Sequence, residues 1–356
     1  MKRRWWGLGL VLGTALTACA AVSADPQQDG DDDGAAGAPG GTGGSTGEGG
    51  GLLEGVGGGS VIVPPVTELS CPEVAQEILV LDFRSGWWSG GGGGNFADSI
   101  LRTMSEVCTT KVEYHHFEID FRVKCSYAGG AGSCTTTQDA IASATLNQIL
   151  TWFDEASWDE YTQVWILSGS EQDATDVAVS GALFDHFLSE TNGSCVPALI
   201  GGGDGFITHG NAVTAELGLG EVFHMELPAP SFFSVMAEAP PYWVTVNGST
   251  TALEDHVLFT DVTSLVDVVG NSFGQVTHGD SLVSSDRYQV IAHDSAGRPT
   301  IAVGAIDLPG DGDRPFILDA GLQRFYGIGQ DASTTHYLQN LVQYLGLVGC
   351  KADIPE

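Results

Sequence analysis

Apolar residues follow two patterns along the chain, one typical of buried strands and one typical of helices. A near-continuous apolar run at residues 78–83 (ILVLDF) indicates a strand that is buried on both faces of a sheet. Shorter apolar runs at 163–167 (QVWIL) and 196–200 (VPALI) predict two further strands. Apolar residues at helical spacing predict helices between and after these strands. The helical ranges are 95–108, 137–153, 173–188, 209–217 and 333–347.

Two other stretches show a strand pattern of a different kind. Residues 111–125 alternate strictly between two faces, which predicts one long strand. Short apolar runs at 288–293, 300–306 and 315–319 stand close together, which predicts antiparallel additions near the C-terminus. Strands that alternate with helices favour an α/β fold with a doubly wound, mostly parallel sheet.

The charge of the chain is strongly negative. Lys and Arg together number 13 against 45 Asp and Glu, so the formal net charge is −32. Such a surface repels phosphate backbones, and we therefore expect no nucleic-acid partner. No apolar run reaches the length that a transmembrane helix needs.

Residues 19–70 differ in composition from the segment that follows. Between residues 26 and 60, 15 of 35 residues are glycine, and Asp31, Asp32 and Asp33 follow one another. A segment with so little apolar surface is expected to be disordered. We therefore expect a Gly/Asp-rich tether over 19–70 in front of one α/β domain over 71–351.

Residues 1–18 resemble the signal peptide of bacterial lipoproteins. A basic start (MKRR) precedes an apolar stretch over 5–16, and residues 16–19 (LTAC) are similar to the lipobox. The resemblance implies cleavage before Cys19, a diacylglycerol on the sulfur of Cys19 and an acyl chain on its new amino group. An ordinary secretory peptide that contains a cysteine is the alternative.

The lipoprotein resemblance also implies a location and a partner. The partner is a lipid membrane, which the acyl chains would enter. Residues Ala20 and Ala21 follow the cysteine, and no Asp stands next to it. By analogy with the family, this favours the outer membrane of the bacterial cell envelope over the inner membrane. No protein ligand or envelope ligand can be named from the sequence.

Six cysteines remain if Cys19 carries lipid, an even number that suggests three disulfides in an oxidising compartment. Four of them stand where the predicted elements reach the N-terminal edge of the sheet, and two flank the Gly-rich turn 126–133. This placement predicts the pairs Cys71–Cys350, Cys108–Cys195 and Cys125–Cys134. A zinc site is the alternative, but the chain has no C-x-x-C pair and no His at the usual ligand spacing.

The loops beyond the carboxyl ends of the predicted strands are the expected place for a ligand. Trp87 and Trp88 stand in the loop 84–94 (RSGWWSGGGGG) and could form a stacking platform for a sugar or another flat ligand. The alternative is that the two indoles pack as a lid on the sheet edge. The glycines that follow lack the Lys of a P-loop.

Two further loops complete this candidate ligand pocket. Ser170 stands in the loop 168–171 (SGSE), and Gly203 and Asp204 stand in the loop 201–205 (GGGDG). Backbone N–H groups at the second loop could bind an anion, although Asp204 opposes this. The alternative is tight backbone packing. No cofactor and no metal is predicted.

These loops and their flanking strands resemble the class I glutamine amidotransferase-like superfamily, including its ThuA-like branch. The likeness rests on a strand that runs into G-x-x-x-G over 201–205. Residues 255–259 (DHVLF) are similar to the D-H-P-I stretch of that branch, and residues 314–319 (RPFILD) to its late strand before a closing helix. The resemblance covers about residues 71–350 and implies a flavodoxin-like sheet.

The chain departs from the catalytic members of that superfamily. Those members hold a cysteine in the middle of G-x-C-x-G, on a sharp turn at a helix N-terminus. Gly203 stands at that position here, and residues 288–294 offer only His293 and Asp294 in place of a His-x-Glu pair. The sequence therefore predicts a non-catalytic binding or structural domain with no catalytic residue.

Two other functions remain open. A hydrolase-type enzyme with an unrecognised site at the strand ends would be favoured if Ser170, Asp204 and a histidine met in one pocket. The chain has no G-x-S-x-G elbow to anchor it. A degenerate von Willebrand A-type adhesion domain is suggested by Asp82, but Arg84 and Gly86 stand at the serine positions of D-x-S-x-S.

One more pair of residues can carry chemistry. His116 and Glu118 share a face of the strand predicted over 111–125. They could contact a metal there. The alternative is that both side chains are solvated.

Overall fold

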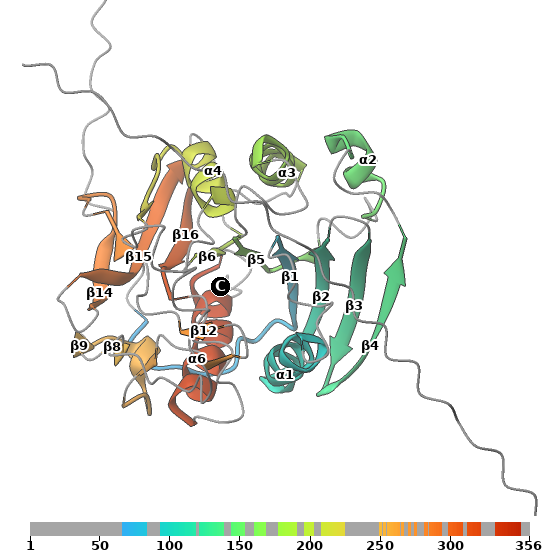
Figure 1. Ribbon diagram of the computed structural model, residues 1–356. Helices are drawn as coiled ribbons and strands as arrows, with labels where there is room; N and C mark the ends of the chain where they lie inside the picture. The colour runs from blue at the N-terminus through green and yellow to red at the C-terminus, as the bar shows by residue number, and fades with distance from the viewer. Residues whose placement is uncertain are drawn as a thin grey trace, which may run out of the picture. The chain divides into compact units, whose positions relative to one another are not determined.

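The chain is described over defined ranges in the computed structural model (Figure 1). The described residues are 66–83, 93–118, 121–138, 144–153, 160–168, 177–190, 196–202, 208–224, 249–250, 252–253, 255–263, 265–266, 270–271, 274–275, 281–283, 285–293, 298–308, 312–321 and 332–349. All described residues belong to one compact unit, Gly57–Glu356.

One 10-stranded mixed sheet forms the centre of this unit, in the order β4-β3-β2-β1-β5-β6-β16-β15-β14-β9 (Figure 1). Its parallel strands are β2 (Thr110–Phe117), β1 (Gln76–Asp82), β5 (Gln163–Leu167), β6 (Ala198–Gly201) and β16 (Gly312–Asp319). The antiparallel strands are β3 (Arg122–Ala128), β4 (Ala131–Thr137), β15 (Pro299–Leu308), β14 (Gln289–His293) and β9 (Ala252–Leu253). The prediction of an α/β fold around a large sheet is confirmed.

Three short strand pairs stand outside this sheet. They are β7 (Phe223–His224) with β13 (Ser281–Leu282), β8 (Ser249–Thr250) with β10 (Leu265–Val266), and β11 (Gly270–Asn271) with β12 (Gly274–Gln275). Each pair is antiparallel and extends over two residues per strand.

Helices lie on both faces of the sheet, because its central strands are apolar on both sides (Figure 1). One face carries α1 (Gly93–Glu106) and α6 (Ala332–Val348), together with the 3-10 helix η3 (Val257–Phe259). The other carries α2 (Leu146–Leu150), α3 (Val177–Glu190) and α4 (Thr208–Glu216). No helix among the described residues is both long enough and apolar enough to cross a membrane.

The pattern over 111–125 was misinterpreted as one strand. The chain forms β2, turns, and returns as β3, and Glu118 N donates to Phe121 O at 2.9 Å across the turn. The turn contains no Gly or Pro, so the alternation of side chains gives no sign of it.

The region after β3 also differs from the expectation. The prediction of one helix over 137–153 is wrong at its start, because β4 ends at Thr137, and among the described residues of this range only Leu146–Leu150 is helical. The turn into β4 is Gly129–Gly130, where both residues have positive φ (56° and 76°). Two adjacent residues of this kind form a tight hairpin turn that matches the twist of its strands.

The structure contains two disulfides among the described residues, and only one of the expected pairs is confirmed. Cys125 pairs with Cys134, as predicted. Cys71 pairs with Cys108, so the predicted pairs Cys71–Cys350 and Cys108–Cys195 are both wrong. Cys195 and Cys350 themselves lie outside the described residues.

The Cys71–Cys108 pair follows from the crossover between β1 and β2. Helix α1 leaves the end of β1 and returns to the start of β2, which lies beside the start of β1. Gln76 N donates to Thr109 O at 2.8 Å at that point. The segment before β1 and the segment after α1 are therefore neighbours at the N-terminal edge of the sheet, as predicted. The predicted pairing of their cysteines with Cys350 and Cys195 is what was wrong.

Candidate functional site

The carboxyl ends of the parallel strands place a row of residues in register on the face that α1 and α6 cover. His116 lies opposite Asp82, Asp82 opposite Leu167, Leu167 opposite Gly201, and Gly201 opposite Asp319. Adjacent strands are about 4.8 Å apart, so the row brings side chains from distant parts of the chain to one edge. Asp82, His116 and Asp319 are all fully buried.

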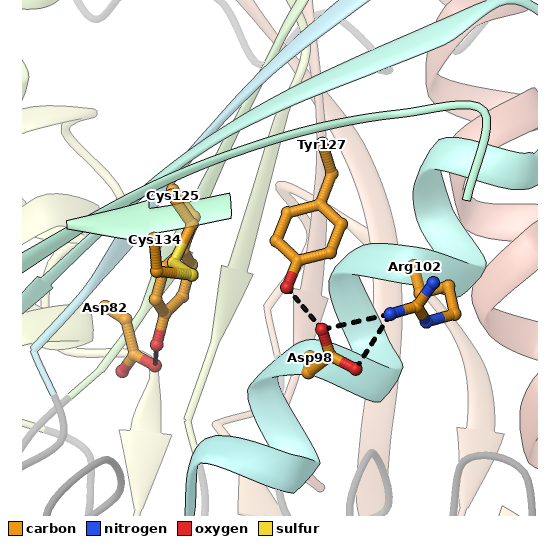
Figure 2. Close-up of a disulfide and its surroundings, with 7 residues drawn as sticks. Asp82, Asp98, Arg102, Cys125, Tyr127 and Cys134 are labelled. Atoms are coloured by element: carbon orange, nitrogen blue, oxygen red, sulfur yellow. Dashed lines mark hydrogen bonds and ion pairs between the residues drawn. A yellow bond between two sulfur atoms is a disulfide. The ribbon is translucent and has the colours of Figure 1, made fainter. Parts of the chain in front are cut away.

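At one end of this row, a histidine lies between two carboxylates. His116 Nδ1 is 3.7 Å from Asp82 Oδ2, and His116 Nε2 is 2.9 Å from Glu118 Oε1. Tyr114 donates its hydroxyl to the same Asp82 oxygen at 2.7 Å. Figure 2 labels Asp82 at its end of this bond. We call these four residues the strand-end cluster.

The strand-end cluster favours the charged form of its imidazole. Burial by itself lowers the pKa of His116, but the two carboxylates of Asp82 and Glu118 outweigh burial, and the pKa of His116 is raised. The raised pKa favours a buried cation between the two buried carboxylates. This is the arrangement that makes a buried ion pair tolerable.

The pKa of the neighbouring His115, on the opposite face of the sheet, is shifted in the opposite direction. His115 Nε2 is 2.7 Å from Glu113 Oε1, and its ring lies 4.4 Å from the ring of Phe153. Burial lowers the pKa of His115 more than Glu113 raises it. Burial also opposes the charge of Glu113, but His115 and Lys124 overcome it and lower the pKa of Glu113 to about 2.

Three other described polar side chains near the strand ends also contact neighbours within the fold. Asp319 accepts the hydroxyl of Tyr337 at 2.9 Å and the N–H of Gly321 at 2.8 Å. Ser168 Oγ, just past β5, accepts the N–H of Gly210 at 2.8 Å. His209, at the start of α4, stacks on Phe83 with ring centres 5.0 Å apart.

The geometry of the strand-end cluster does not suit a metal ion. The two carboxylates approach His116 from opposite ring nitrogens, so their oxygens do not converge on one point. Within the described part of the chain, no group of three or more His, Cys, Asp or Glu side chains could hold a metal. The alternative that His116 and Glu118 are solvated is also wrong, because both are buried.

The described cysteines offer no nucleophile at this edge. Cys71, Cys108, Cys125 and Cys134 are all in disulfides. The residues of the candidate ligand pocket, Trp87, Trp88, Ser170, Gly203 and Asp204, lie outside the described residues, as does the lipid-attachment residue Cys19.

The sequence points to parts of the strand-end cluster but not to the whole. Asp82 stands out as the start of a degenerate adhesion-type metal motif, and His116 and Glu118 share one face of the predicted strand, but the pattern does not connect these residues. Nothing in the sequence pointed to Tyr114 of this cluster, or to Asp319 farther along the same row. An Asp that ends a run as apolar as ILVLDF is the signal that could have pointed to a buried polar cluster.

Comparison with known proteins adds no relative to these observations. No protein-family model matches the chain, and no curated protein matches it in sequence. The described residues define an α/β protein with a mixed sheet and a row of buried polar residues at the ends of its parallel strands.

Proposed function

We propose that this protein is a bacterial lipoprotein whose globular part is a non-catalytic binding or structural module. Residues 1–18 act as the signal peptide, Cys19 carries the lipid, residues 19–70 form the tether, and residues 71–351 form the head. The head has the doubly wound, flavodoxin-like architecture of the amidotransferase-like superfamily. Its location is the bacterial cell envelope, on the outer membrane in cells that have one.

A non-catalytic head is supported by the observation that the described polar side chains at the strand ends are buried and bonded to other groups of the fold. His116 contacts both Asp82 and Glu118, Asp319 is bonded to Tyr337, and Ser168 accepts a backbone N–H. All of these side chains are buried. Groups held in this way stabilise the edge of the sheet rather than react with a substrate. The absence of a cysteine at Gly203 agrees with this.

The lipid anchor can be tested directly. We expect the mature chain to begin at Cys19 and its N-terminal peptide to carry the mass of a diacylglycerol and an acyl chain. The change Cys19→Ser should abolish incorporation of labelled palmitate, because the sulfur is the attachment point. The matched control Ala20→Ser keeps the sulfur and should keep the label. An unmodified N-terminus at another residue would refute the anchor and leave the proposal for the head untouched.

A hydrolase-type enzyme is the second candidate, and one observation favours it. Ser168 lies beside the start of α4, where its Oγ accepts the N–H of Gly210 and where His209 is also found. A serine nucleophile with a histidine as its general base is a common arrangement in nucleophilic catalysis.

A fluorophosphonate probe separates these two functions. Because Ser168 is fully buried and already accepts a hydrogen bond, we expect no covalent labelling of the folded chain. Intact-protein mass spectrometry measures this, with Ser168→Ala as the matched control. Labelling that disappears in Ser168→Ala would replace the non-catalytic module with the enzyme.

A further inference from the structure

Strand β4 is an open edge of the 10-stranded sheet. It is the outermost strand beside β3 in Figure 1, and no described strand pairs with its other side. The residues from Ala131 to Thr136 are exposed, and the pairing with β3 continues over all 7 residues without a bulge. An edge of this length can pair with another strand unless it is protected.

The usual means of protecting an edge are missing from β4. Its sequence, AGSCTTT, contains no charged residue and no proline. Natural sheets block their edges with charges, prolines, bulges or covering segments. Here the side chains are small and neutral, so they would not obstruct an incoming strand.

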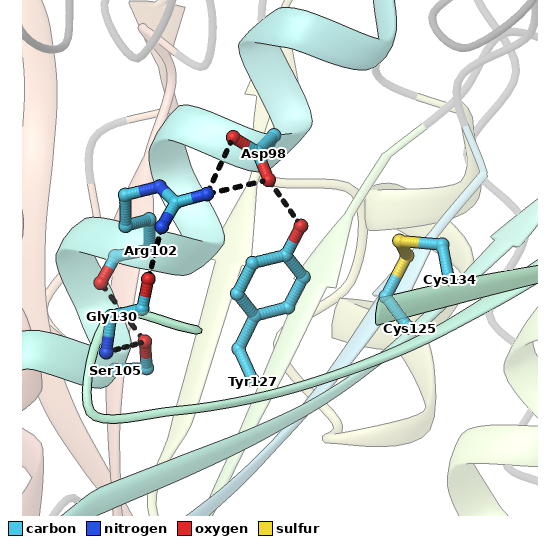
Figure 3. A network of polar contacts seen from close by, with 7 residues as sticks. All are labelled: Asp98, Arg102, Ser105, Cys125, Tyr127, Gly130 and Cys134. Carbon is cyan, nitrogen blue, oxygen red and sulfur yellow. Dashed lines mark hydrogen bonds and ion pairs between the residues drawn. A yellow bond between two sulfur atoms is a disulfide. The ribbon is translucent and has the colours of Figure 1, made fainter. Parts of the chain in front are cut away.

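The edge is held in a fixed position before any partner arrives. The disulfide Cys125–Cys134 joins β4 to β3. The turn before β4 is hydrogen-bonded to α1. Gly129 N donates to Ser105 O at 3.0 Å, and Gly130 N donates to Ser105 Oγ at 3.1 Å. Figure 3 shows the second of these bonds. The Arg102 guanidinium also donates to Gly130 O.

A second contact secures the same hairpin. Tyr127 donates its hydroxyl to Asp98 of α1 (Figures 2 and 3). The Tyr127 ring passes over Gly132, where a Cβ would come within 2.4 Å of it, so glycine is needed at this point of β4. A strand that is rigid before binding loses little conformational freedom when it pairs.

The register of the hairpin shows which backbone groups face outward. Cys125 and Cys134 are directly opposite, with their Cα atoms 4.0 Å apart, which is typical of a non-hydrogen-bonded antiparallel pair. The N–H and C=O of Cys134 therefore point away from β3. Because the pattern repeats every second residue, those of Gly132 and Thr136 point the same way.

We infer that β4 pairs with β4 of a second copy of this chain, antiparallel and across a two-fold axis at Cys134. The outward groups are symmetric about that residue, so Gly132 of each copy would pair with Thr136 of the other, and each such pair exchanges two hydrogen bonds. Two sheets then join into one. The inference goes beyond the proposed function and does not depend on the lipid anchor.

Charge favours a second copy at this edge. Two molecules that each carry a large negative charge repel one another over most of their surfaces. β4 has no charged side chain, and the nearby Lys124 of β3 is paired with Glu113 at 2.8 Å. The edge is thus a place where two copies can approach without bringing unpaired acidic side chains together.

The test is the oligomeric state of the mature full chain in a mild detergent, measured by native mass spectrometry and analytical ultracentrifugation. We expect a concentration-dependent dimer. Thr136→Pro removes an outward N–H but leaves the ladder to β3 intact, and should raise the dimer dissociation constant about tenfold or more. The matched control Thr136→Val keeps the N–H and should leave the dissociation constant nearly unchanged.

A pair of double variants tests the register and guards against a folding defect in the proline variant. In the inferred dimer Ser133 faces Thr135 of the other copy. Ser133→Asp with Thr135→Asp should weaken the dimer by opposing like charges, and Ser133→Lys with Thr135→Asp should restore it. A wild-type chain that stays monomeric, or a dimer that all these changes leave unaltered, overturns the inference.

Discussion

Replacing Cys71 and Cys108 together by serine should lower the free energy of unfolding by about 4 kcal/mol. The disulfide joins residues 37 positions apart, so it removes a large part of the freedom of the unfolded chain. It also ties the segment before β1 to the end of α1, at the N-terminal edge of the parallel strands. Urea-induced unfolding at neutral pH, followed by circular dichroism, measures the change.

The second disulfide is the matched control for this prediction. Cys125 and Cys134 are only 9 positions apart, and replacing both by serine should cost about 2.6 kcal/mol on the same loop-entropy argument. Non-reducing peptide mapping of the wild-type chain should recover Cys71 linked to Cys108. Equal losses in the two double variants, or a larger loss at Cys125–Cys134, would contradict the loop-entropy argument.

The buried parallel strands were predictable because each is apolar on both faces. The expected strands at 78–83 and 163–167 agree closely with β1 and β5, and the expected helix at 333–347 agrees with α6. Strand β4 was not predictable in this way. It is exposed on both faces, so its residues carry no alternation of apolar and polar positions to detect.

The strand-end cluster was only partly predictable for a related reason. A polar residue in an alternating strand usually faces water, and nothing in the local sequence shows that α1 and α6 cover this face instead. His116 and Glu118 are buried by elements that follow from the tertiary fold. The relation of Asp82 to His116 depends on the register of β1 and β2, which periodicity does not determine.

Replacing His116 by glutamine should cost about 3–5 kcal/mol of stability at pH 6, because it leaves Asp82 and Glu118 buried without a cation between them. The cost should decrease as the pH rises. The pKa of His116 is raised in the fold, so folding favours its protonated form. This contribution is complete below the unfolded pKa of 6.5 and is lost as the pH rises through the folded pKa.

The neighbouring residue gives a control with the opposite sign. The pKa of His115 is lowered by burial, so folding favours its neutral form. Relative to His115→Gln, the wild-type chain should therefore gain stability as the pH rises toward 6.5. Relative to His116→Gln, it should lose stability as the pH rises above 6.5. Urea unfolding of the three chains at a series of pH values from about 5 to 9 measures both trends. A difference between wild type and His116→Gln that stays constant over this range would show that His116 is not held as a cation between Asp82 and Glu118.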